Sequence, residues 1–444
     1  MRGDDYLVLN SIVMTGRQDR TAGYLELLRR NRNFRKLWMG QVVSELGDWL
    51  STIALLNLLL EATGRAQAIA LFFIVIYIPG MAVGPVAGGL VDRLDRKRLM
   101  IAMDIARAFL VLGYLLVRRA DQAWLIYLIA ASEATLMTLF EPARAAAIPN
   151  LCQPREWVSA NALGSITWST VLAAGSALGG LVTAVFGRKV CFILDSLSFL
   201  LSAFFVSRIS ARFEASSPQG PPWKGIASAF ADIAGGFAYI RSRPAVLAAL
   251  LVKTAWGLGG GVLLLLSVFG ERIFPLMGSG AAGIGALYAA RGIGAGLGPV
   301  VARRLAGETR RALQNSITVA FFISGLFYAA FGQARAFLPA ALALLLAHMG
   351  GSVLWVFSTV LLQRDVSDDF RGRVFALDFV LFFLGFAASN YLAGYFLDAL
   401  RLNPRTIAVL LGAYLLLSGL LWALALRRVR ISRARPIDTP EIRW

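Results

Sequence analysis

The chain has 444 residues, of which 57% are hydrophobic, and its mean hydropathy is +0.66. Soluble globular domains are about 45–50% apolar, so this composition argues against a soluble domain and favours a bundle of membrane helices. In a soluble protein, the formal net charge of +18 would suggest nucleic-acid binding. Here the basic residues fall between apolar stretches, so membrane topology explains them and we expect no nucleic-acid partner.

The chain begins with a mostly polar segment, residues 1–36, and ends with a basic tail, residues 428–444. We expect the first segment to be a cytosolic tail with one short amphipathic helix near Tyr24–Arg30. Between the tails lie twelve apolar stretches of about 20 residues, the length that a bilayer core requires. They are placed at 37–60, 67–90, 99–117, 123–143, 159–186, 190–209, 245–269, 280–302, 312–332, 337–361, 374–398 and 405–426.

One long polar interruption, residues 210–244, divides the twelve stretches six to six. Its segment Ser216–Pro222 is rich in residues that interrupt helices, and Lys224–Arg243 has the pattern of an amphipathic surface helix. The predicted six-helix bundles are therefore residues 37–209 and 245–427. Most basic residues lie in the tails and alternate loops, and the positive-inside rule places that side, with both termini, in the cytosol.

A faint internal repeat supports this division. Gly84-Pro85-Val86 in the second stretch recurs as Gly298-Pro299-Val300 in the eighth. The segment Pro154–Trp157 has a weaker counterpart at Ser367–Phe370, at nearly the same offset. Two parallel repeats around a central site are a known plan for secondary transporters. The sequence therefore predicts an all-α membrane protein with twelve transmembrane helices in two six-helix pseudo-repeat halves.

The turn after the second stretch, Gly88–Lys97, reads GGLVDRLDRK. It resembles the loop 2–3 signature of the major facilitator superfamily, and departs from it at Asp95, where glycine is usual. Phe140–Arg144 and Arg371–Ala376 resemble the loops 4–5 and 10–11 of a bacterial efflux branch that includes the enterobactin exporter and macrolide efflux pumps. The resemblance covers about residues 33–427, and it implies the major facilitator fold and alternating access.

This turn also contains a candidate cytosolic gate. We expect Asp92 to approach the start of the eleventh helix, and Arg93 or Arg96 to reach Glu141 at the end of the fourth. Such contacts would stabilise an outward-facing state, whereas Lys97 is explained by charge retention on the cytosolic side. The full candidate set is Gly88, Asp92, Arg93, Arg96, Lys97, Glu141, Arg371 and Arg373.

Ionisable residues inside the apolar stretches are candidates for proton coupling, because each costs about 2.5–3.5 kcal/mol to insert at the centre of a membrane helix. Asp48 should lie near mid-membrane, and Glu45 shares its helix face. Arg107 is the candidate cationic partner, and Glu133 is a further candidate carboxylate. The alternative is that these residues form only structural ion pairs. Asp104, Asp195 and Asp378 also fall inside stretches, and for Asp195 the structural interpretation is preferred.

The second half contains two cations near the expected midplane, Lys253 and Arg291. Either of them can hold an anionic group of a substrate or pair with a carboxylate of the other half. Trp256 and Tyr77 lie at similar depths and complete the candidate substrate cavity. For any single aromatic residue, packing or contact with lipid is the alternative role.

The sequence contains no motif for nucleotide binding or metal binding. No phosphate-binding loop of the form G-x-x-x-x-G-K-[ST] occurs, so we do not expect ATP hydrolysis. Cys152, Cys191 and His348 form no metal-ligand pattern. We therefore expect no metal, no cofactor and no catalytic residue.

The leading hypothesis is a secondary active transporter that exports a lipophilic or amphipathic small molecule, such as a drug, metabolite or siderophore, by proton antiport. It would act as a monomer in the bacterial cytoplasmic (inner) membrane. A second hypothesis is uptake of an anionic metabolite or lipid through Lys253 and Arg291. A third, a membrane-embedded enzyme or sensor, lacks a nucleophile motif and a sizeable soluble domain.

Overall fold

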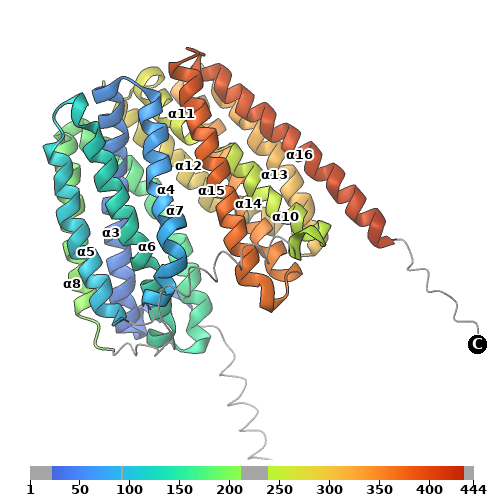
Figure 1. The fold of residues 1–444 in the computed structure, drawn as a ribbon, viewed down its shortest axis with the longest axis horizontal. Coiled ribbons are helices and arrows are strands. Elements are labelled where there is room, and N and C mark those ends of the chain that lie inside the picture. Colours follow the sequence, from blue (N-terminus) through green and yellow to red (C-terminus); the bar gives the residue numbers. More distant parts are fainter. Residues whose placement is uncertain (1–22, 92–93, 212–238, 435–444) are drawn as a thin grey trace, which may run out of the picture. The chain divides into compact units, whose positions relative to one another are not determined.

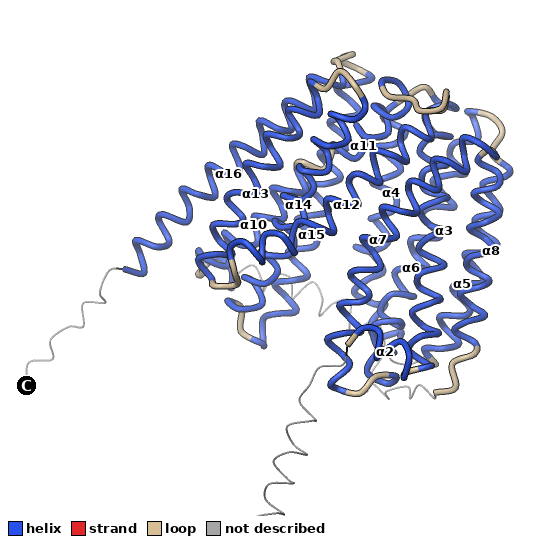
Figure 2. The backbone as a smooth tube through the Cα atoms, turned by 180° about the vertical axis from the view of Figure 1, so that it is seen from behind, coloured by secondary structure: helices blue, strands red, loops and turns tan. Residues whose placement is uncertain are grey.

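The computed structural model describes residues 23–91, 94–211 and 239–434, and these residues are almost entirely helical (Figures 1 and 2). Twelve segments are long and apolar enough to cross a membrane, which confirms the predicted number. The helices are α2 (Tyr24–Arg30), α3 (Arg32–Thr63), α4 (Ala66–Val91), α5 (Arg96–Leu112), η1 (Gly113–Leu116), η2 (Ala120–Gln122), α6 (Ala123–Leu151), α7 (Pro154–Phe186), α8 (Arg188–Ser207), α10 (Pro244–Leu258), α11 (Val262–Val268), η3 (Phe269–Ile273), α12 (Gly280–Ala306), α13 (Arg310–Gln333), α14 (Phe337–Asp365), α15 (Asp368–Asp398) and α16 (Pro404–Ala434).

The fourth and fifth helices extend well beyond the predicted apolar stretches. The fourth ends at Leu151 and the fifth begins at Pro154, so only a short turn joins them. The carboxylate of Glu156 accepts a hydrogen bond from the backbone N–H of Gln153 at 2.9 Å, and proline is favoured at the first helical position. The helices continue past the apolar stretches because hydrogen bonding at the helix ends, and not hydropathy, decides where a helix begins or ends.

The seventh span, predicted at residues 245–269, is interrupted at Gly259–Gly261, between α10 and α11. Ser389 of α15 supplies hydrogen-bond partners for the backbone groups at this interruption. Gly261 donates its N–H to Ser389 Oγ at 2.9 Å, and the Ser389 hydroxyl donates to the carbonyl of Leu258 at 2.6 Å. Non-helical backbone is tolerated at membrane depth where protein groups satisfy it. The apolar stretch does not reveal this interruption, because the hydrogen bonds that satisfy it come from α15.

The chain forms two compact units, one of residues 1–54 and 78–225 and the other of residues 55–77 and 226–444. In the first, α5 packs against α6 and α8; in the second, α13 packs against α14 and α16 (Figure 1). The same pairs of helices therefore meet in both halves of the repeat. Of the predicted linker helix, residues 224–238 lie outside the described residues, and the first described residues after the gap, 239–241, are helical.

The repeat extends to the helix caps. Asp95 precedes α5, and its side chain accepts a hydrogen bond from the N–H of Arg98 at 3.1 Å. Thr309 precedes α13 and accepts in the same way from the N–H of Ala312 at 3.1 Å. Both residues therefore act as N-caps. This role gives a physical reason for aspartate at a position where the family signature has glycine.

Candidate functional site

The charged core of the first unit contains a close ion pair. Asp48 of α3 lies beside Arg107 of α5, with 2.6 Å between Oδ1 and Nη2. The Arg107 side chain is 5% exposed and that of Asp48 is 31% exposed. The guanidinium also lies 4.0 Å above the Phe199 ring and donates to the sulfur of Met137 at 3.6 Å. The structure thus brings together the two residues that the sequence proposed as partners, and fixes the arginine on several sides.

More carboxyl groups surround this arginine than one cation can neutralise. Asp104 is fully buried and accepts a hydrogen bond from the Ser202 hydroxyl at 2.7 Å. Glu133 accepts one from the Tyr114 hydroxyl at 2.6 Å. The carboxyl groups that interact electrostatically with Arg107 are those of Asp48, Asp104, Glu133 and Asp195. The unit therefore concentrates four acids around one guanidinium in its membrane core.

Sequence reasoning missed the hydroxyl partners of these acids. Tyr114 was not singled out, although the repeat offers a signal for it. In the second unit Tyr328 occupies the equivalent place on α13, and its hydroxyl lies 3.3 Å from Nε2 of His348 on α14. A tyrosine of the third helix of each half thus contacts a titratable residue of the fourth, Glu133 in one half and His348 in the other.

Glu45 lies on a separate hydrogen-bonded chain. Its Oε1 accepts from Gln41 at 2.7 Å, and Gln41 accepts from Arg144 at 2.9 Å. Arg144 in turn pairs with Glu141 through both carboxylate oxygens, at 2.6 and 3.1 Å. The other oxygen of Glu45 is buried and has no hydrogen-bond partner within the described part of the chain. This chain extends from the carboxylate in α3 to the last turns of α6.

The predicted cytosolic gate is only partly visible. Asp92 and Arg93 lie outside the described residues, and the surroundings of the Gly88 position in α4 are not described. Lys97 donates to the carbonyl of Ile209 at 2.7 Å. Arg371 donates to the carbonyl of Gln363 at 3.3 Å, and Arg373 lies 5.3 Å from the Phe370 ring.

Of the two arginines expected to reach Glu141, Arg93 lies outside the described residues and Arg96 contacts another residue near the end of α6. Arg96 donates to Asn150 Oδ1 at 2.8 Å, while Glu141 is held by Arg144. The repeat explains this choice, because in the second unit Arg310 donates to Asp365 at 2.6 Å. In each half, the first residue of the third helix is thus joined to the end of the fourth.

Lys253 and Asp378 form an ion pair inside the second unit. The Nζ–Oδ2 distance is 2.5 Å, and the two side chains are 1% and 0% exposed. The ammonium also lies 4.8 Å from the Trp355 ring and 5.5 Å from the Phe379 ring. Asp378 belongs to the same half as Lys253, whereas one expectation was that Lys253 pairs with a carboxylate of the other half. Because Lys253 is buried and neutralised, it is not available to a substrate in this conformation.

Arg291, on α12, lies among aromatic side chains. Its guanidinium carbon is 5.7 Å from the Tyr288 ring. Trp256 stacks on Tyr328 with ring centroids 6.0 Å apart and meets His348 edge-on at 5.9 Å. Tyr288 lies beside the interruption in the seventh span, because its hydroxyl donates to the carbonyl of Leu263 in α11 at 3.0 Å.

Tyr77, the fourth cavity candidate, belongs to the second unit as well. It stacks on Phe383 with centroids 4.7 Å apart and meets Phe386 edge-on at 5.1 Å. Its phenol group interacts electrostatically with Arg291. Three of the four predicted cavity residues, Arg291, Trp256 and Tyr77, therefore gather around one aromatic region.

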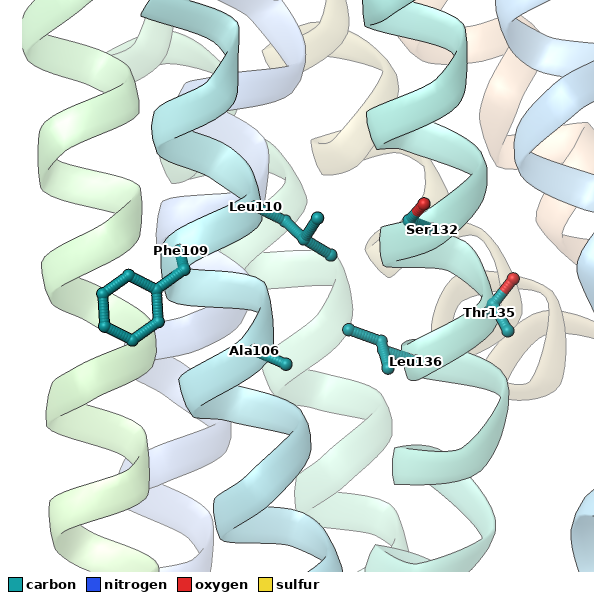
Figure 3. Close-up of a pocket in the computed structure, with 6 residues that line it drawn as sticks. All are labelled: Ala106, Phe109, Leu110, Ser132, Thr135 and Leu136. Carbon is teal, nitrogen blue, oxygen red and sulfur yellow. The ribbon is translucent and has the colours of Figure 1, made fainter.

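A groove of about 600 Å³ lies between α5 and α6 (Figure 3). The hydroxyls of Ser132 and Thr135 donate to carbonyls of their own helix at 2.8 and 2.7 Å. The lining of this groove contains no charged side chain and none of the predicted site residues. The lining residues are Ala106, Phe109, Leu110, Ser132, Thr135 and Leu136.

Twelve spans in two repeated halves, each with charged residues inside its core, define a multi-pass transport protein of the major facilitator fold. Solved structures with this fold include the nucleoside transporter NupG, with a TM-score of 0.70 and 12% identity, over 88% of this chain and 99% of that one. A bacterial homologue of the human lysosomal transporter Spinster has a TM-score of 0.66 and 15% identity, over 92% and 99% of the two chains.

The model of the transmembrane secretion effector family matches residues 27–440, so the chain belongs to this family of major facilitator transporters. The putative bacilysin exporter BacE of Bacillus subtilis is 25% identical over 78% of this chain and 84% of its own length. Similarity to the MFS-type transporter YfiS of B. subtilis (29%) and to macrolide efflux protein A of Streptococcus pyogenes (24%) covers about half of each chain. The protein is a bacterial membrane transporter and not an enzyme.

Proposed function

We propose that this transporter exports a lipophilic or amphipathic small molecule from the cytosol in exchange for protons. It would work by alternating access, as a monomer in the cytoplasmic membrane with both termini in the cytosol. The relatives named for bacilysin export and macrolide efflux support the direction of transport. The observation that carries the proton assignment is the partly exposed carboxylate of Asp48 beside the buried Arg107.

The excess of acid over base in the first unit supports proton exchange. Four ionised carboxylates beside one guanidinium would leave a large uncompensated charge in a dehydrated core, which is costly. Bound protons remove this cost without moving any helix. We assign the exchange to Asp48, because its side chain is 31% exposed whereas Asp104 and Asp195 are buried.

Contacts at the α3–α4 turn support alternating access. Asp398 of α15 accepts hydrogen bonds from the first N–H groups of α4, those of Ala66 at 3.1 Å and Gln67 at 2.7 Å. Asn57 of α3 donates to Glu271 in η3 at 2.9 Å. In the proposed orientation, these polar contacts close the outer end of the second unit and must break when that end opens.

Asp398→Ala should increase the population that is open at this end, because loss of a helix N-cap costs about 0.5–2 kcal/mol. We expect a several-fold rise in the longer-distance population between spin labels at Arg65→Cys and Arg401→Cys, in a background with both native cysteines replaced by serine. Asp121→Ala, at an exposed loop aspartate, is the control. An identical distance distribution in Asp398→Ala and the parent would show that this contact does not hold the closed end.

Asp48→Asn tests the proton assignment. In everted membrane vesicles energised with a pH gradient, we expect the variant to lose gradient-driven accumulation of a radiolabelled macrolide and of radiolabelled bacilysin. Exchange of the same compounds without a gradient should persist, because the amide keeps the shape of the carboxyl group but cannot release a proton.

The matched control for this test is Asp121→Asn, at a loop aspartate whose side chain is 63% exposed. It should accumulate both compounds as the parent does. Normal gradient-driven accumulation by Asp48→Asn would mean that another residue carries the proton. Absence of transport of either compound by the parent would reject these cargoes.

The alternative function, uptake of an anionic compound, depends on Lys253 and Arg291 as binding residues, and one of the two is already paired. Lys253 is neutralised by Asp378, so Arg291 alone remains to hold an anion. The direction of transport can be separated by comparing right-side-out with everted vesicles for the same labelled compounds.

A further inference from the structure

The two cations in the membrane core of the second unit have different environments. Lys253 is buried against Asp378 at 2.5 Å. Arg291 has no carboxylate within ion-pair distance among the residues that the structure describes, and its buried Nε lacks a hydrogen-bond partner there. The unit therefore holds one compensated cation and one uncompensated guanidinium.

An uncompensated guanidinium in a membrane core is costly, and such residues mark substrate or ion pathways. A guanidinium keeps its positive charge in proteins. The cost of burying Arg291 can therefore be lowered only by a negatively charged or polar partner. The anion that completes its environment has to come from outside the described chain.

The surroundings of Arg291 are suited to an aromatic or apolar body. Besides the Tyr288 ring at 5.7 Å, the phenols of Tyr77 and Tyr328 interact electrostatically with the guanidinium. Trp256 stacks on Tyr328 and presents a second large ring system to the same region. Aromatic faces bury apolar surface, and the phenol groups add polar contacts.

The interrupted seventh span points to the same place. Trp256 lies just before the interruption at Gly259–Gly261, and Tyr288 is bonded to α11 just after it. In many transporters, discontinuous helices form the substrate site near the midplane. Two independent features, a broken helix and an unpaired cation, thus coincide on the α10–α11–α12 side of the second unit.

We propose that Arg291 binds a carboxylate of the cargo, whose aromatic or apolar body lies against Trp256, Tyr288 and Tyr77. This inference rests on the proposed export function and adds a substrate class, amphipathic carboxylates. A carboxylate matches the planar fork of a single guanidinium through two parallel hydrogen bonds. With Lys253 already paired, one positive charge is balanced by one negative charge, whereas a phosphate dianion would leave an excess.

The test uses purified full-length protein in detergent and two fluorescent probes, dansyl-phenylalanine and its methyl ester. Energy transfer from tryptophan to the dansyl group reports binding. We expect the parent to bind the free acid about 10- to 100-fold more tightly than the ester, the range for hydrogen bonds to charged groups. Arg291→Gln should bind the two probes with similar affinity, and Arg291→Lys should keep part of the preference.

The matched control is Arg304→Gln, at an exposed arginine near the end of the same helix, which should keep the full preference. Equal binding of acid and ester by the parent, failure of the parent to bind the acid, or an unchanged preference in Arg291→Gln would each overturn the inference. If Arg291→Gln is not monodisperse, the same comparison is made with Arg291→Lys, for which an unchanged preference counts against the inference.

Asp48→Asn separates this inference from the proposed function. It should keep the preference for the acid, because Asp48 belongs to the first unit. If Asp48→Asn transports normally while the acid preference still depends on Arg291, the proton assignment fails and the carboxylate site stands. If Asp48→Asn loses gradient-driven transport but no variant shows an acid preference, the carboxylate site fails and the proton assignment stands.

Discussion

Lys253→Met should destabilise the protein by about 3–5 kcal/mol, the usual cost of breaking a buried ion pair by removing one partner. The variant leaves the Asp378 carboxylate in a site where its side chain is 0% exposed. The second oxygen of Asp378 already has no hydrogen-bond partner among the described residues, so no existing contact compensates for the loss. Unfolding in detergent, followed by fluorescence against temperature and against added SDS, measures the effect.

The double variant Lys253→Met with Asp378→Leu should recover most of the lost stability, because apolar residues of similar volume often replace a buried ion pair at little cost. Arg304→Gln, at an exposed position of α12, controls for loss of a positive charge elsewhere in the unit. Parental stability in Lys253→Met alone would show that the ion pair is not needed, and failure of the double variant to recover would assign the lysine a packing role instead.

Arg107→Gln should reduce gradient-driven transport by the folded protein about tenfold or more, because a hydrogen bond to a charged group contributes about 1.5–3 kcal/mol and each 1.4 kcal/mol is a factor of ten. Arg107 is the common partner of the carboxyl groups in the first unit, and it also packs on Phe199. Without the guanidinium, Asp48 loses the contact at 2.6 Å that stabilises its charged form.

The vesicle assay used for Asp48→Asn measures this loss, with the amount of folded protein matched by size-exclusion chromatography. Arg107→Lys should be intermediate, because an ammonium keeps the charge but not the planar fork. Arg118→Gln, at an exposed arginine after the same span, should transport as the parent does. Transport by Arg107→Gln at the level of Arg118→Gln would exclude Arg107 from coupling.

Much of the fold was predictable because hydropathy alone selects membrane helices. The number of spans, the helix at Tyr24–Arg30 and the division into two repeats all follow from apolar length and polar interruptions. The features of the helices that the apolar pattern did not reveal have a common origin. The start of α7 at Pro154 and the break at Gly259–Gly261 depend on hydrogen bonds to side chains, and for the break the side chain lies more than a hundred positions away in the chain.

The candidate site was predictable in its membership but not in its pairings. Insertion cost singled out Asp48, Arg107, Lys253 and Arg291 as costly residues inside membrane spans, and this argument needs only the sequence. It treated Lys253 and Arg291 as equivalent. The contact with Asp378 distinguishes them, and it depends on how α10 and α15 pack.

The sequence by itself therefore determined the class of protein, the twelve spans and the set of charged residues that a membrane core must accommodate, because apolar length and insertion cost are local properties. Only the tertiary structure decided which charges neutralise one another. Arg107 gathers the acids of the first unit, Asp378 neutralises Lys253, and Arg291 is left without a described carboxylate. The physical reason is that ion pairing requires contact within a few ångströms, and helix packing brings together residues that are distant in the chain.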